Sequence, residues 1–158
     1  MAAQTGRTVQ DWVNLLISNG ASMVSIPIDT LGDIGLDYPE TAMTAFVDAI
    51  KGVLVGKPDF SLTFGGPVDN TATTGSHVIL SAANGVMTAR SFDVQIGIQH
   101  AWTAGEPQFG ISAVVASNSG IMITQYKIAG AKFTAKMSMI AGSALAPAWG
   151  TAAEAVPA

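Results

Sequence analysis

The chain has 158 residues, no cysteine and a net charge of −4. The absence of cysteine excludes disulfides and thiolate metal sites, and the negative charge argues against a surface that neutralises nucleic-acid phosphates. Only 11% of the residues are charged, where about 25% is usual, and yet no apolar run approaches the ~18–20 residues of a membrane helix. We therefore expect one domain, 1–158, that covers much of its surface with other subunits.

The first part of the chain shows mixed patterns. Residues 7–17 fit either an amphipathic helix or a strand, and residues 22–28 read as a strand with a proline at its end. Residues 29–40 contain two glycines, a proline and four acids, which predicts a long loop.

The next segment has the spacing of a short helix. In residues 44–54, Phe46, Ile50 and Leu54 recur at helical intervals, although two glycines keep such a helix short. Residues 59–64 then read as a further strand.

Strand patterns dominate the second half. Residues 91–102 alternate, with an apolar set on one side and a polar set opposite. Residues 108–117, 121–129 and 131–141 follow as strands, the last two flanking Gly130. Successive strands joined by such short turns predict antiparallel pairing and a mainly β domain. The residues from 150 to 158 lack periodicity and are expected to form a flexible tail.

Residues 64–77, Phe-Gly-Gly-Pro-Val-Asp-Asn-Thr-Ala-Thr-Thr-Gly-Ser-His, are the most obvious place to look for a reaction. A phosphate loop needs a lysine after its last glycine, and none follows Gly75. Ser76 and Ser81 lie in no nucleophile elbow that would pair them with His77 or His100. We therefore expect no catalytic residue and no enzyme activity.

Metal-ligand patterns are equally weak. The two histidines have no recognised ligand spacing relative to Asp69 or Asp93, and His100 lies on an apolar strand face, which favours a packed histidine. The acids of residues 29–40 lack the spacing of a calcium-binding EF-hand loop. We expect neither a metal nor a cofactor.

Four motifs occur in a characteristic order. They are "IGLDYPETAMTAFVDAIKGVLVGKPDFSLTFGGPVDNTA", "GSHVIL", "GEPQFGISAVV" and "PAWGT". Their order, over roughly residues 30–150, resembles the major tail (tail tube) proteins of long-tailed bacteriophages with non-contractile tails. Within it lie an Asp/Lys-bearing segment, a G-x-x-D turn and a strand that ends in GP-x-D, with the residues Asp48, Lys51, Gly56, Asp59, Gly66, Pro67 and Asp69.

The resemblance implies an antiparallel β-sandwich or partial barrel with one flanking α-helix at about residues 70–83. Asp69 or Asn70 is expected to cap this helix, and Gly85 to end it. Six copies would form a ring, and stacked rings would form the tube through which DNA passes without specific binding. The same resemblance implies tape-measure, terminator and tail-tip proteins as partners, no membrane, and a place in the virion tail after assembly in the host cytoplasm.

Two surfaces are expected to serve that assembly. Apolar side chains flanked by acids in the loop 29–40 predict the contact between rings, through Asp33, Ile34, Leu36, Asp37, Tyr38 and Glu40. An uncharged or acidic strand face would let DNA slide, and the possible lumen-lining residues are Ser91, Asp93, Gln95 and Gln99. The face of Lys132 and Lys136 is expected outside or against a neighbour.

Two other functions remain open. The chain is also compatible with the tube protein of a contractile injection or type VI secretion system, which shares the ring fold. A small β-sandwich decoration or ligand-binding module is the third possibility.

Overall fold

The computed structural model describes residues 12–45, 49–97, 102–111 and 119–150, and these residues form eleven strands and one helix. The elements in chain order are β1 Trp12–Ser18, β2 Met23–Ile26, β3 Thr30–Leu31, β4 Glu40–Ala42, β5 Val53–Val55, β6 Ser61–Pro67, α1 Ser76–Ala83, β7 Phe92–Gly97, β8 Gln108–Ile111, β9 Ile121–Ala129, β10 Lys132–Met139 and β11 Ala148–Gly150.

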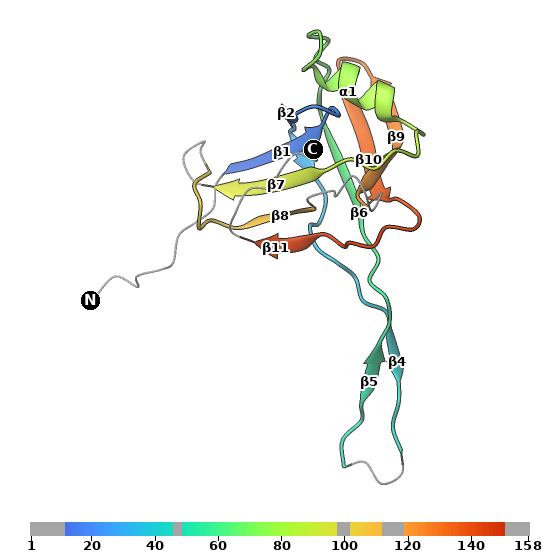
Figure 1. The fold of residues 1–158 in the computed structure, drawn as a ribbon. Helices are drawn as coiled ribbons and strands as arrows, with labels where there is room; N and C mark the ends of the chain where they lie inside the picture. The colour runs from blue at the N-terminus through green and yellow to red at the C-terminus, as the bar shows by residue number, and fades with distance from the viewer. Residues whose placement is uncertain (1–11, 46–48, 98–101, 112–118, 151–158) are drawn as a thin grey trace, which may run out of the picture.

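Two antiparallel sheets form the body (Figure 1). One sheet has the strand order β11-β8-β7-β1-β2, and the other has the order β3-β6-β10-β9. Every pair of neighbouring strands in them is antiparallel. The predicted fold class, a mainly β antiparallel sandwich with one helix, is confirmed, and the sheets do not close into a barrel.

The core lies between the sheets and is filled by alternate residues of each strand. Phe92 and Val94 of β7 are fully buried, as the period-two pattern requires. The ring of Phe60 stacks on that of Phe92 at 5.3 Å and tilts against that of Phe109 at 5.6 Å. This aromatic cluster joins the two halves of the chain, because β6 follows residue 60 and β8 contains residue 109.

The β9–β10 hairpin confirms the predicted strands on either side of Gly130. That glycine has a φ of +65°, a value that suits a tight hairpin turn and few other residues. The pairing shifts by one position between Lys136 and Met137, which is a β-bulge.

The helix is shorter than predicted and its cap is different. It begins at Ser76, its N-cap is Gly75, and no side chain caps it. The predicted caps Asp69 and Asn70 are therefore wrong. The Asp69 carboxylate instead accepts hydrogen bonds from the amide and hydroxyl of Thr71, at 2.9 and 2.6 Å, and these bonds lower its pKa.

Asp69 nevertheless supports the helix through its backbone. Its carbonyl oxygen accepts a hydrogen bond from the His77 amide at 2.9 Å, and its amide donates to the Ser76 hydroxyl. At the other end the helix stops at Ala83, and Gly85 with a φ of +75° follows, as predicted.

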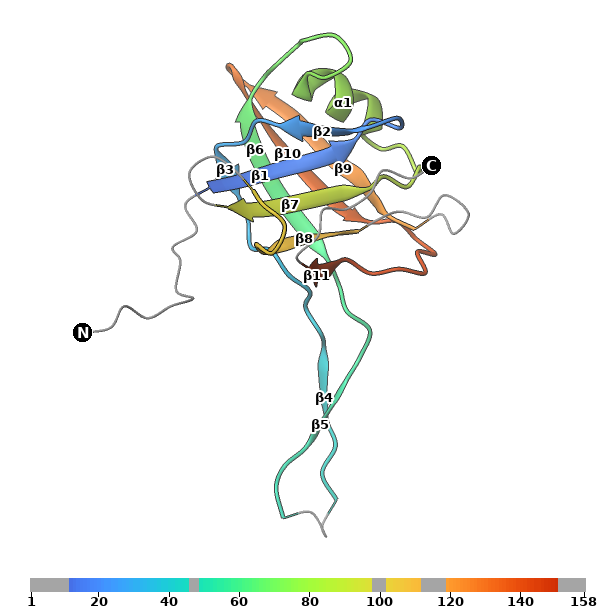
Figure 2. The ribbon, with the colours of Figure 1, turned by 60° about the vertical axis from the view of Figure 1, so that its left-hand side comes forward.

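The predicted helix over residues 44–54 is wrong. Within the described part of this segment the chain runs into β5, which pairs with β4 to form a hairpin that projects from the body (Figures 1 and 2). We call residues 40–55 the arm. Residues 46–48, which include Phe46 and Asp48, lie outside the described residues. The arm and α1 lie at opposite ends of the molecule in both views.

The predicted loop 29–40 is partly ordered into strands. Thr30 and Leu31 pair with β6 as β3, and Glu40 begins β4. Likewise Gly150, expected in the flexible tail 150–158, belongs to β11 and pairs with Gln108. The rest of that tail lies outside the described residues.

Candidate assembly surface

The arm carries five of the twelve exposed large apolar side chains among the described residues. Within the described part of the arm they are Met43, Ile50, Val53, Leu54 and Val55, exposed by 53 to 84%. The arm has its own sheet, and its two strands pair with each other alone. An exposed apolar surface of this size on a projecting hairpin is typical of a protein–protein contact.

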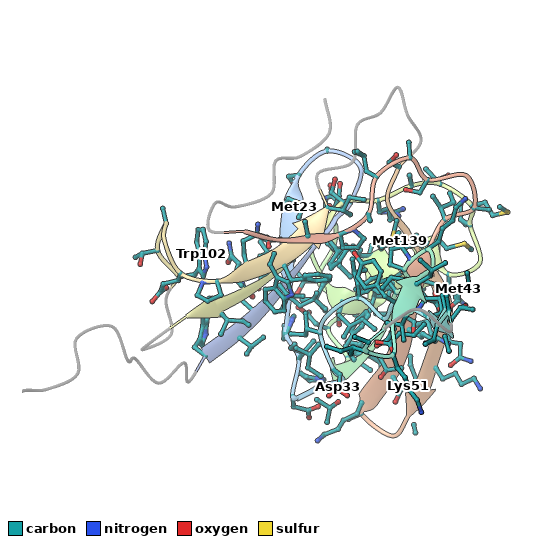
Figure 3. The ribbon with its side chains drawn as sticks, turned by 90° about the horizontal axis from the view of Figure 1, so that it is seen from below. Met23, Asp33, Met43, Lys51, Trp102 and Met139 are labelled. Carbon is teal, nitrogen blue, oxygen red and sulfur yellow. The ribbon has the colours of Figure 1, made fainter. Side chains whose placement is uncertain are left out.

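The arm joins the body at a root held by two backbone contacts. Gly56 donates to the Pro39 carbonyl at 2.8 Å, and Asp37 and Asp59 exchange backbone hydrogen bonds at 3.0 and 2.7 Å. Figure 3 looks along the arm towards the body, with Met43 and Lys51 on the arm. These contacts fix the direction in which the arm leaves the sandwich.

Just above the root, the chain bulges away from β6. Gly32 donates to the Thr63 carbonyl at 2.8 Å, and the next contact is the Asp37–Asp59 pair. Between these two points four residues, 33–36, face only three, 60–62. The extra residue arches the chain outward, as in a β-bulge.

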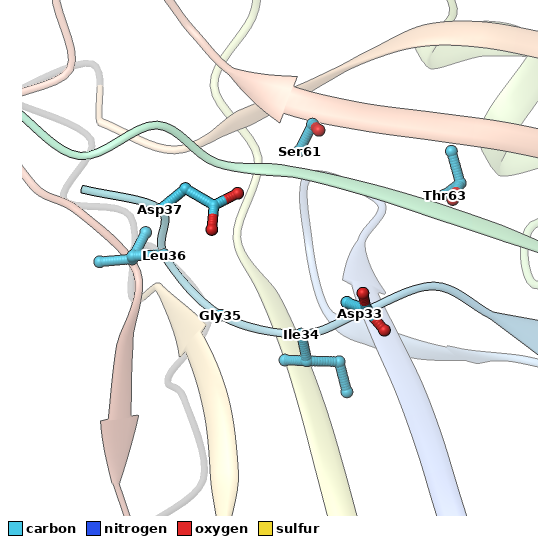
Figure 4. Close-up of a pocket in the computed structure, with 7 residues that line it drawn as sticks. All are labelled: Asp33, Ile34, Gly35, Leu36, Asp37, Ser61 and Thr63. Carbon is cyan, nitrogen blue, oxygen red and sulfur yellow. The ribbon is translucent and has the colours of Figure 1, made fainter. Parts of the chain in front are cut away.

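The bulge encloses a polar cavity of about 320 Å³ (Figure 4). Asp33 and Asp37 come from the bulged segment, and Ser61 and Thr63 come from β6. Among the described residues neither carboxylate has an ion-pair or hydrogen-bond partner, and both residues are exposed. The cavity therefore presents uncompensated negative charge at the base of the arm.

A second, more apolar cavity adjoins the first. It has a volume of about 340 Å³ and shares Leu36 with the polar cavity. Its floor is aromatic, since the ring of Trp149 lies 5.0 Å from that of Phe109 while Trp149 stays 54% exposed. The lining residues are Leu36, Tyr38, Phe109, Pro147, Ala148 and Trp149.

The six residues predicted for the contact between rings do gather at this root, but they differ in exposure. Ile34 and Leu36 are partly buried and pack against the core of their own chain. Tyr38 is 51% exposed, and the three acids Asp33, Asp37 and Glu40 are also exposed. The exposed apolar side chains of the arm were not among the predicted contact residues, because the spacing of residues 44–54 favoured a helix.

The predicted lumen residues are mostly covered. Ser91 and Asp93 are 0 and 1% exposed, which counts against their lining a channel. Asp93 lies on an interior strand, in register with Leu16 on one side and Gly110 on the other. Gln95 is half-buried and accepts a hydrogen bond from Asn14. Gln99 lies outside the described residues.

The outer face of the four-stranded sheet is hydrophilic. Along β10, Lys132 and Lys136 lie on this outer face, and the alternate residues Phe133 and Ala135 are buried on the opposite face. The Lys132 ammonium lies 2.7 Å from the Asp29 carboxylate, and this contact lowers the pKa of Asp29. Because both groups are exposed, the pair contributes little to stability.

The hydroxyl and imidazole groups of the strand-to-helix junction serve the fold. Ser76 is buried, and its hydroxyl donates to the Pro67 carbonyl at 3.3 Å. His77 Nδ1 lies 2.9 Å from the Tyr126 hydroxyl, and Ser81 donates to the His77 carbonyl. None of these contacts brings a serine hydroxyl to the imidazole.

The described residues contain no group of three histidine, aspartate or glutamate side chains placed to hold a metal ion. Across the same residues, no helix has both the length and the apolar character needed to cross a membrane.

The fold is similar to that of chains in three solved tail assemblies. A chain from the cryo-EM structure of the anti-feeding prophage (AFP) tube terminating cap matches with a TM-score of 0.57 and 10% identity, covering 96% of this chain and 95% of that chain. A chain of the 6-fold symmetrised AFP baseplate matches with a TM-score of 0.59 and 8% identity, covering 93 and 97%.

The third is a chain from the extended sheath–tube complex of an extracellular contractile injection system, PVC. Its TM-score is 0.51 at 9% identity, and the match covers 87% of this chain and 88% of that chain. No protein-family model and no curated protein sequence matches the chain. The likeness is therefore one of fold, and it spans nearly the whole of each chain.

Proposed function

We propose that this chain is a structural subunit of a phage-like tail of the contractile injection class, which acts by assembly and performs no catalysis. The observation that carries the proposal is the likeness of fold over 87 to 96% of the chain to components of such assemblies. The sequence resemblance pointed first to non-contractile phage tails and named a contractile-system tube as the alternative. The alternative now has the better support, because PVC is a contractile injection system.

In this proposal six copies form a ring, rings stack into a tube, and the lumen conducts the cargo of the particle. The 6-fold symmetrised AFP baseplate supports the number six. A head-to-tail contact between identical subunits can close into a ring laterally and repeat without limit axially. The low charged fraction of 11% suits a subunit that contacts neighbours within its own ring and in the rings next to it. The expected partners are the other proteins of the tail.

The arm and its root are the proposed contact between rings. Apolar side chains exposed by half or more are costly to leave in water, and the arm presents five of them away from the body. The proposed axial contact therefore comprises residues 33–45 and 49–55, of which the predicted loop 29–40 contains only the root.

Electron microscopy and sedimentation of the purified protein test the proposal. Tubes with a central hole and a sixfold end view are the expected result. A protein that stays monomeric at high concentration, and when seeded with preformed tail tips, would contradict it, as would a monomer that binds a sugar. A sheath gene beside the coding gene would support the contractile class over the non-contractile one.

A further inference from the structure

The root of the arm holds two adjacent cavities of different chemistry. One carries the carboxylates of Asp33 and Asp37, and the other is lined by aromatic and aliphatic side chains, including Tyr38 and Trp149. Since Leu36 lines both cavities, a ligand that filled them together would present an apolar group and a cation close to each other.

The far end of the arm offers such a pair. Ile50 is 84% exposed, the largest exposed fraction among the described large apolar side chains, and Lys51 beside it is also exposed. No described acidic residue pairs with Lys51. The arm therefore carries an exposed apolar side chain and a cation, and Lys51 has no ion-pair partner among the described residues of its own chain.

The tip does not reach the root of its own chain. Asp59 at the root lies nine positions after Ile50, and an extended chain over nine positions spans about 30 Å. The paired strands β4 and β5 keep this segment extended. The complementary surfaces can therefore meet only between two copies.

We propose that the arm tip of one copy docks into the arm root of the next copy, with Ile50 in the apolar cavity and Lys51 between Asp33 and Asp37. The inference rests on the proposed function and adds the residues of its axial contact. Because the two surfaces differ, the contact is heterologous and repeats as an open series. An ammonium that meets two carboxylates at a partly enclosed site makes stronger contacts than a fully exposed pair.

Engineered cysteines test the contact directly, because the chain has none of its own. Under mild oxidation, the double variant Ile50→Cys/Ala148→Cys is expected to give a ladder of covalent multimers. The matched control Ile50→Cys/Ala82→Cys places the second thiol on α1, at the other end of the molecule, and should give no ladder. A ladder that stops at the dimer would overturn the open series in favour of a reciprocal exchange of arms.

Charge reversal tests the role of Lys51. Lys51→Glu should raise the protein concentration needed for assembly by on the order of tenfold, and Asp33→Lys/Asp37→Lys added to it should restore most of the loss. Lys127→Glu makes the same charge change at an exposed position on β9, outside the arm and its root, and should have little effect.

The outcomes separate this inference from the proposed function. Suppose that the wild type forms tubes. If Ile50→Cys/Ala148→Cys then gives no ladder, or if Lys51→Glu assembles normally, the docking is overturned and the proposed function still stands. A wild-type protein that forms no assembly under any condition would overturn both.

Discussion

Removal of the arm should abolish assembly while leaving the fold intact. The change is to replace residues 40–55 with Asn-Gly. A two-residue turn can close the gap, because Pro39 and Gly56 are already joined by a 2.8 Å backbone hydrogen bond. The described part of the arm contributes no residue to the buried core cluster, so we expect the core to survive its loss. A deletion of residues 31–38 would be less informative, since Ile34 and Leu36 pack on that core.

The size of each effect follows from exposure and chain length. The five apolar side chains of the arm together leave exposed about three complete side chains' worth of surface. At about 1.5–3 kcal/mol for each, covering them contributes at most about 5–9 kcal/mol per arm. The connection shortens from sixteen residues to two, which lowers the entropy cost of closing it by up to about 2 kcal/mol. The free energy of unfolding should therefore be unchanged or higher.

Urea unfolding and sedimentation velocity measure the two effects on the same sample. A full-length variant with Val53, Leu54 and Val55 each changed to Thr is the matched control, since threonine keeps the strand propensity but removes apolar surface. It should assemble more weakly than the wild type and more strongly than the deletion. Tubes formed by the deletion at the wild-type concentration would refute the reasoning, and a much less stable deletion would show that the arm supports the body.

Three further predictions concern the body. Phe92→Ala should lower the free energy of unfolding by about 3–5 kcal/mol, because the ring is fully buried against Phe60 and Phe109. A loss of less than about 1 kcal/mol in urea unfolding would contradict the described core. Gly75→Ala should lower the free energy of unfolding by about 1–3 kcal/mol, since the added Cβ would lie 2.4 Å from the Asp69 carbonyl oxygen. Ala82→Gly, a substitution within the adjoining helix, is its control and should lower the free energy of unfolding by at most about 1 kcal/mol. The pKa of Asp69 is lower in the folded chain than in the unfolded one. Its ionised carboxylate therefore stabilises the fold above the unfolded pKa of about 3.9, and this stabilisation is lost as the pH falls through that value towards the folded pKa. Asp69→Asn should therefore flatten the fall in stability between about pH 5 and pH 3, and an unchanged pH profile would count against the Thr71 hydrogen bonds.

Strands whose two faces differ in polarity could be predicted closely from the sequence. Strand β9 has the predicted bounds 121–129, and β10 at Lys132–Met139 lies within the predicted 131–141, because Gly130, with its positive φ, allows the tight turn between them. Strand β7 follows the same rule, but its polar face could not be interpreted. The alternation of apolar and polar residues assigns them to two faces of a strand. It does not show whether the polar face is covered by the rest of the chain, as it is at Asp93.

Elements that depend on distant partners could not be predicted. The apolar residues within 44–54 recur at helical spacing, but the described part of this segment contains no helix. Val53 instead pairs with Ala42 of β4, and this pairing makes residues 53–55 a strand. Asp69 resembles a helix cap, but its side chain is used by Thr71 two residues later, so the helix starts only at Ser76. The polar cavity at the root follows from one extra residue between two backbone contacts, and the second cavity needs residues 109 and 147–149 from distant parts of the chain, so no local pattern reveals either cavity.

The pairing of the arm with itself alone has a consequence for the timing of assembly. An isolated two-stranded hairpin is marginally stable in water, and the ladder of the arm contains only three residue pairs. In the proposed assembly, ordering the arm of each incoming subunit therefore costs free energy before the contact is complete. Growth should show a lag and a sharp critical concentration, both removed by a preformed end that holds the first arms in place. In the proposed assembly, free subunits below the critical concentration would remain dispersed until a tail tip provides the template.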